Sequence, residues 1–311
     1  MNIKKIINKF LKFKPIALIN QVSKKLVLPG FDGMPLHNVA SFFFRDLWNG
    51  SINLRASALS FTFFLALFPA IIFFFTLIPY IPIHGFQDTL LIMLKGIIPK
   101  DAYNAAFTTL EDIIKRQHGN LLSIGFLTAL FFATSGISGI MSAFNNSIHI
   151  AESRSFFKQS LSAILLVFIL SILIIIAITL IIAGTALLDY LVKRGYLQND
   201  FTYYVLMVSK WIIITAMSFF IISFLYYFAP AKRERFRFIS AGSTLATLLF
   251  ILTSLGFNFY ISNFSQYNKL YGSIGALIII LMWIYINAIV LLIGFELNAS
   301  IMNAKKSKKN N

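Results

Sequence analysis

The sequence predicts an all-α, polytopic membrane protein with six transmembrane helices and both termini in the cytoplasm. Of the 311 residues, 58% are hydrophobic and only 12% are charged, and the mean hydropathy is +0.79. A water-facing surface of ordinary size cannot be built from so few charged side chains, so lipid is the expected solvent for most of the chain. The apolar residues also gather in six long runs instead of being scattered.

Each of the six runs is long enough to cross a bilayer. About 20 helical residues, rising 1.5 Å each, span a hydrocarbon core of about 30 Å. Runs of this length argue against a membrane β-barrel, whose strands would show alternating segments of about ten residues. The predicted spans are residues 56–80, 121–144, 161–188, 203–228, 239–261 and 273–301. Together with their connections they form a predicted transmembrane domain over residues 51–302.

The basic residues predict the orientation and the partners. With six spans, 19 Lys and Arg residues fall on the side that holds both termini and 7 fall on the other side. This is the positive-inside pattern, which predicts cytoplasmic termini. Anionic lipid headgroups at the cytoplasmic face account for the same clusters. We therefore expect the basic residues, which give a net charge of +16, to bind membrane lipids and not nucleic acid.

Three regions lie outside the predicted spans. Residues 1–50 alternate basic and apolar side chains, and "LHNVASFFFRDLWNG" within them is typical either of an amphipathic helix in the membrane interface or of a simple anchoring elbow. The external loop 81–120 has helical spacing on both sides of Pro99, which predicts two short helices. Residues 303–311 form a predicted basic cytoplasmic tail.

Four stretches of the sequence carry a resemblance to a known family. They are "LRASALSFTFFLALFPAIIFFF", "GISGIMSAFNNSIHIAESRSFFKQ", "LYYFAPAKRERFRF" and "FYISNFSQYNKLYGSIGALIIILMWIYINAIVLLIGFELNASI". Together they resemble the YihY/BrkB family of bacterial inner-membrane proteins, formerly labelled ribonuclease BN. The resemblance runs from about residue 40 to the end, in the family's order. It implies six spans, cytoplasmic termini and a role in the cell envelope. Members are associated with serum resistance in a pathogen, and lipid or lipopolysaccharide transport has been considered for them.

Nothing in the sequence indicates an enzyme. Cysteine is absent, and the four histidines (His37, His84, His118 and His149) are separated from one another by more than a helical turn. No nucleophile elbow or phosphate-binding glycine loop is present in the sequence. We therefore predict no catalytic residues, no metal ligands and no cofactor.

Charged residues and helix breaks inside the spans predict a functional cavity, because a charge in lipid tends to face protein or water. Arg55 and Glu296, near the cytoplasmic ends of spans one and six, suit either a structural ion pair or headgroup contact, or a gating carboxylate in a cytoplasm-facing cavity. Lys210 could reach the outer headgroups or hold an anionic substrate group. Pro69 removes a hydrogen bond from span one and is expected to kink it. The predicted cavity residues are Arg55, Pro69, Lys210, Tyr267, Asn268, Tyr271, Gly272, Gly275 and Glu296.

These observations favour a transporter or lipid-handling protein of the bacterial cytoplasmic membrane. Two other classes stay open. One is a membrane scaffold that organises envelope proteins through residues 1–50 and the external loop. The other, more remote, is the tRNA-processing ribonuclease of the family's former label.

Overall fold

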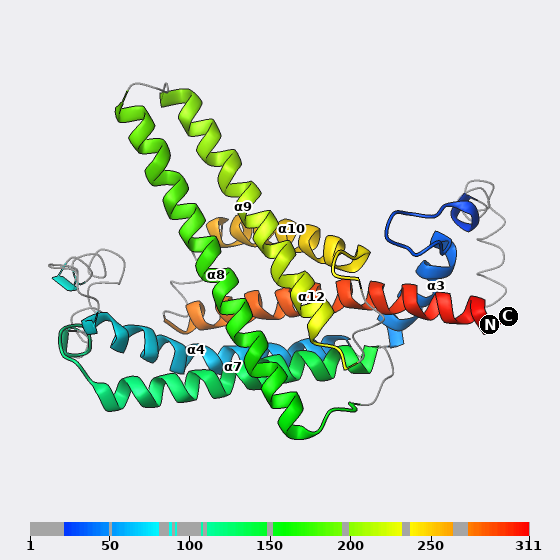
Figure 1. Ribbon diagram of the computed structural model, residues 1–311, viewed down its shortest axis with the longest axis horizontal. Coiled ribbons are helices and arrows are strands. Elements are labelled where there is room, and N and C mark those ends of the chain that lie inside the picture. The colour runs from blue at the N-terminus through cyan, green and yellow to red at the C-terminus, as the bar shows by residue number, and fades with distance from the viewer. Residues whose placement is uncertain are drawn as a thin grey trace. The chain divides into compact units, whose positions relative to one another are not determined.

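The computed structural model describes residues 22–49, 52–80, 87–88, 91, 107, 111–147, 152–194, 199–231, 237–263 and 273–310. Within these ranges all regular structure is helical, which confirms the predicted class (Figure 1). Its long helices are α3 (Leu36–Asn49), α4 (Ile52–Leu77), α7 (Gly119–Ser147), α8 (Phe156–Lys193), α9 (Asn199–Phe228), α10 (Ala241–Asn263) and α12 (Ser273–Asn310). A single turn of 3₁₀-helix, Ile78–Tyr80, follows α4.

Six of these helices are long and apolar enough to cross a membrane. They are α4, α7, α8, α9, α10 and α12, which correspond one to one with the six predicted spans. Several helices extend beyond the apolar run, because polar residues at a span end can continue a helix in water. The segment predicted as a tail, residues 303–311, is helical as far as Asn310. Most of the external loop 81–120, with its two predicted short helices, lies outside the described residues.

The chain divides into two compact units. One contains residues 60–136, and the other contains the residues before 60 together with those from 137 onward. In the first of these, small residues of α7 let the helix approach α4: a Cβ atom at Gly125 would lie 3.2 Å from the Phe73 nitrogen. The Phe73 and Phe126 rings are in contact beside it, 5.5 Å between centroids. Helix α4 continues without interruption over Pro69.

In the larger unit, α10 and α12 pack most closely. A Cβ atom at Gly294 of α12 would lie 2.6 Å from the Ala246 Cβ of α10, so only glycine fits at that crossing. Close approach of this kind is the usual role of small residues between membrane helices. Asn298 adds polar bonds at the same interface, because its Oδ1 accepts from the Gly242 N–H at 2.8 Å and its Nδ2 donates to the Ser240 hydroxyl at 2.9 Å.

The amphipathic helix α3 packs on the end of α12. A small apolar core joins them, formed by Phe31, Met34, Val39, Ile301 and Ala304. In the turn before α3, Asp32 has a left-handed backbone conformation (φ 51°), as do Gly30 and Gly33 on either side of it. The Asp32 carboxylate pairs with Arg237 at 3.2 Å and with Lys305 at 3.3 Å, which ties this turn to the segment before α10 and to α12.

Candidate functional site

A buried ion pair joins α4 to α12. The Arg55 Nη2 lies 3.5 Å from the Glu296 Oε2, and the two side chains are only 12% and 2% exposed. The other terminal nitrogen of Arg55 donates to the Ala143 carbonyl of α7 at 2.9 Å and to the Ser147 hydroxyl at 2.6 Å. Three helices therefore meet at one guanidinium.

Because the Arg55–Glu296 pair is buried, the loss of either charge would leave the other without a counter-charge. Two charges withdrawn from solvent attract strongly, but each alone would carry a large desolvation penalty. Hydrogen bonds to Ala143 and Ser147 offset part of that penalty for the guanidinium. A charge pair of this kind in a membrane segment can be structural, or it can be an element that opens when a ligand or proton changes its state.

Three buried aromatic side chains join α7, α9 and α12 close in sequence to the ion pair. The Phe144 and Phe295 rings, which neighbour Ala143 and Glu296 in sequence, are stacked with centroids 3.9 Å apart. Tyr226 of α9 packs edge-on against both rings and donates its hydroxyl to the Leu291 carbonyl at 2.6 Å. All three rings are fully buried. They bind α9 to the same junction of α7 and α12.

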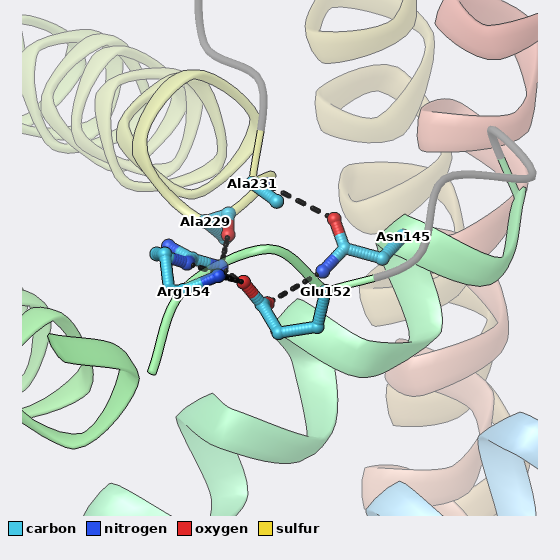
Figure 2. A network of polar contacts seen from close by, with 5 residues as sticks. All are labelled: Asn145, Glu152, Arg154, Ala229 and Ala231. Carbon is cyan, nitrogen blue, oxygen red and sulfur yellow. Dashed lines mark hydrogen bonds and ion pairs between the residues drawn. The ribbon is translucent and has the colours of Figure 1, made fainter. Parts of the chain in front are cut away.

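A second polar cluster lies at the end of α7 (Figure 2). Arg154 binds the Glu152 carboxylate through Nε and Nη2, both at 2.8 Å, and Nη2 also donates to the Ala229 carbonyl at 3.0 Å. Asn145 donates to Glu152 at 2.8 Å and accepts from the Ala231 N–H at 2.9 Å. The segment between α7 and α8 is thus fastened to the segment that follows α9.

Glu152 lies outside the membrane-spanning segments, and its surroundings favour the charged form. The hydrogen bond from the Arg154 side chain lowers the pKa of the Glu152 carboxyl below its ordinary value of 4.5. Partial burial opposes this shift, while the Arg154 N–H and the Asn145 amide add to it. The cluster is therefore held together by an ionised carboxylate.

An apolar groove of about 810 Å³ runs between α9 and α10. Its α9 wall includes Trp211, Ala216 and Phe219, and its α10 wall includes Thr244 and Thr247. Both threonine hydroxyls donate to carbonyls of their own helix, Ser240 at 3.1 Å and Ser243 at 2.8 Å, so they offer little polarity to an occupant. The groove is suited to a hydrocarbon chain.

Of the predicted cavity residues, the structure brings Arg55 and Glu296 together. Gly275 is buried in the first turn of α12, about 30 Å of helix from Glu296. Lys210 is exposed on α9 and does not line the groove. Pro69 belongs to the unit of residues 60–136. Tyr267, Asn268, Tyr271 and Gly272 lie outside the described residues.

Sequence reasoning missed several polar residues around the site: Ser147, Asn145, Glu152, Arg154 and Asn298. All five occur in the stretches that carry the family resemblance, which was the available signal. The bonds that Ser147, Asn145, Arg154 and Asn298 make to distant segments could not be read from the sequence, whereas Glu152 pairs with its near neighbours Arg154 and Asn145. In the described part of the chain, no three His, Asp or Glu side chains group closely enough to hold a metal ion.

Comparison with known proteins agrees with the resemblance. The family model described as "Virulence factor BrkB" matches residues 43–311. The chain belongs to the BrkB family. A BrkB relative from Bacillus subtilis, named "Putative ribonuclease-like protein YfkH", is 30% identical over 81% of this chain and 90% of its own length. A "UPF0761 membrane protein" of Tolumonas auensis is 24% identical over 84% of both chains. No solved structure matches this BrkB chain significantly. It is accordingly a multi-pass membrane protein of the BrkB family.

Proposed function

We propose that this protein moves or handles lipids of the bacterial cell envelope from within the cytoplasmic membrane. The observation that carries the proposal is the groove between α9 and α10. Its volume of about 810 Å³ falls in the range of about 300–1,000 Å³ typical of sites for small molecules. The groove lies between two candidate membrane spans, so the acyl chains of membrane lipids surround it and can occupy it.

The groove is connected to the Arg55–Glu296 pair through α9 and an aromatic contact. Tyr226 lies two helical turns beyond Phe219 on α9, and it packs on Phe295, the residue before Glu296. In this proposal the Arg55–Glu296 pair holds α4, α7 and α12 in one arrangement. Breaking the pair would shift α7 and α12, on which Tyr226 of α9 packs. A charge inside a membrane segment, with a named partner, is the usual starting point for such a mechanism.

Lipid movement in proteoliposomes tests the proposal. Protein reconstituted with a fluorescent phospholipid is treated with an impermeant quencher, and the rate at which inner-leaflet lipid becomes accessible is measured. We expect the wild-type protein to raise this rate over empty liposomes. Ala216→Trp, which fills the groove, should return it towards the empty value.

The matched control is Leu165→Trp on α8, where the side chain is exposed and lies outside the groove. This variant adds the same indole to a lipid-facing helix and should keep the wild-type rate. A wild-type rate equal to that of empty liposomes would refute lipid movement. That result would favour the scaffold. A raised rate that is equal for wild type and Ala216→Trp would remove the groove from the mechanism.

A ribonuclease activity has one observation in its favour, the name of the Bacillus subtilis relative, "Putative ribonuclease-like protein YfkH". We propose that this chain is not an enzyme. In both polar clusters described above, the carboxylate is paired with an arginine that also bonds to a distant part of the chain, which is typical of a structural contact. Purified protein, separated from cellular nucleases, is expected to leave tRNA precursors intact. Cleavage that co-purifies with the protein and is lost in a variant of it would contradict this.

A further inference from the structure

A polar pocket of about 530 Å³ lies between α3 and the end of α12. Its polar lining consists of His37, Asn38 and Ser41 from α3 and of Ser307 and Lys308 from α12. Phe42 and Ala304 complete the wall, and both belong to the apolar contact that joins the two helices. The pocket is therefore built on a packed helix pair.

The pocket contains residues that the family match does not cover. The match begins at residue 43, whereas the whole α3 side of the lining comes from residues 37–42. These residues are held in place by the Asp32 turn and by Val39, which is buried against α12. The segment before the family match thus completes a site together with the end of the last span.

The chemistry of the lining selects an anion. None of its side chains carries a negative charge, while an ammonium, two hydroxyls, an amide and an imidazole can all donate hydrogen bonds. Among the ion pairs of the described residues, Lys305 and Arg237 are matched by Asp32, and none involves Lys308. The Arg45 guanidinium stands 4.8 Å from the ring centroid of Phe42, but it is paired with Asp46 at 3.2 Å, so Lys308 is the cation that the pocket itself supplies.

The surroundings point to a lipid source for that anion. On α3, Ser41, Phe44, Arg45 and Trp48 are exposed at the spacing of a single helix face, and Ser41 lines the pocket. Phe44 is 67% exposed and Trp48 is 91% exposed, which suits a helix that lies at the boundary of a bilayer. A headgroup in the same boundary region would meet the pocket directly.

We propose that this pocket binds the phosphate of an anionic phospholipid headgroup. Lys308 neutralises the phosphate, and Ser41 and Ser307 donate hydrogen bonds to its oxygens. The site is separate from the α9–α10 groove and does not depend on lipid movement. Its failure and the failure of the proposed function are therefore distinguishable.

Lipid binding to the detergent-purified full chain tests this inference. Native mass spectrometry would follow the titration of dioctanoyl phosphatidylglycerol, with dioctanoyl phosphatidylcholine and inorganic phosphate as the other probes. We expect phosphatidylglycerol to bind more tightly than phosphatidylcholine. Lys308→Ala should weaken the first phosphatidylglycerol site about tenfold, the usual effect of losing one hydrogen bond to a charged group. Lys308→Arg, which keeps the charge, should restore most of the affinity.

Lys306→Ala is the matched control, because it removes the same charge two residues earlier on the same helix and outside the lining. We expect less than a twofold effect from it. Equal losses in Lys306→Ala and Lys308→Ala would show general attraction to a basic tail and would overturn the pocket. Displacement of phosphatidylglycerol by an equal concentration of inorganic phosphate would overturn the headgroup as the ligand. Retention of the wild-type elution volume on size exclusion establishes that each variant is folded.

Discussion

The Arg55 guanidinium and the Glu296 carboxylate meet at 3.5 Å although 241 residues separate them in the chain. Their pairing joins the first and last spans directly. Because Arg55 also bonds to Ala143 and Ser147, α7 is included in the same contact. The energetic consequences of that arrangement can be tested one residue at a time.

Removal of one partner from the buried pair should destabilise the fold strongly. Arg55→Met leaves the Glu296 carboxylate without its counter-charge, and we expect a loss of about 3 kcal/mol in the free energy of unfolding. Arg55→Met/Glu296→Leu removes both charges and should lose less than the sum of the single variants. Thermal unfolding of the four proteins in detergent measures the coupling. Strict additivity would show that the two side chains do not interact in solution.

The predicted cavity gives a functional test at two positions. Glu296→Gln keeps the size of the side chain and removes its charge, and we expect it to lower lipid movement in proteoliposomes. Lys210→Met acts on an exposed side chain, so the melting temperature should stay within the range of neutral surface substitutions while lipid movement falls. A variant that inserts normally and retains the wild-type rate would exclude its residue from the functional cavity.

The polar cluster at the end of α7 should make stability depend on pH. The pKa of Glu152 is lower in the folded protein than its ordinary value of 4.5, chiefly because Arg154 bonds to the carboxylate. This stabilisation is complete above the unfolded pKa and is lost as the pH falls through the lower folded pKa. The difference in melting temperature between wild type and Glu152→Gln should therefore shrink as the pH is lowered from 7 towards 3.

An exposed carboxylate provides the control for that measurement. Glu111 pairs with Lys115 one helical turn away, and its side chain is 40% exposed. Glu111→Gln should change the free energy of unfolding by about 0.5 kcal/mol or less at any of these pH values. A pH-independent difference for Glu152→Gln would mean that the Arg154 contact contributes nothing to folding.

Two helical glycines should respond oppositely to alanine. At Gly294 a Cβ atom would lie 2.5 Å from the Tyr226 hydroxyl oxygen and 2.6 Å from the Ala246 Cβ. Gly294→Ala must therefore separate α10 from α12 and should cost about 1–3 kcal/mol. At Gly256 nothing lies within 4 Å, so Gly256→Ala should be neutral or gain up to about 1 kcal/mol from helix propensity. Melting temperatures in one detergent compare the pair, and equal shifts would contradict the close crossing.

The membrane fold was predictable because each span is marked locally by its own apolar run. Arg55 and Glu296 could be singled out for the same reason, since a charge in hydrocarbon is conspicuous in the sequence. An ion pair between Arg55 and Glu296 was one of the predicted alternatives, but the partners of Arg55 in α7 were not predictable. Ser147 looks like any serine at a helix end until α7 is placed beside α4. The same holds for Asn145 and Arg154, whose bonds to Ala231 and Ala229 depend on how two connecting segments meet.

The ends of the helices and the contact between α3 and α12 could not be predicted from the sequence, for a different physical reason. Helix α12 continues through the basic segment to Asn310 because lysine and asparagine do not stop a helix when the preceding turns are already formed. The pocket beside it depends on a left-handed turn at Asp32 that no apolar pattern marks. Predictions about Tyr267, Asn268, Tyr271 and Gly272 stay predictions.

Val39 and Ile301 belong to one buried apolar cluster, and this has a topological consequence. Val39 lies before the first span, and Ile301 lies towards the end of the last. A chain can bring these two positions into contact only if it returns to the leaflet from which it started, so it must cross the membrane an even number of times. The shared cluster therefore agrees with an even number of crossings, as do the six candidate spans. Cysteines introduced at these two positions should form a disulfide under oxidation. That result would show that both positions lie on the same side of the membrane.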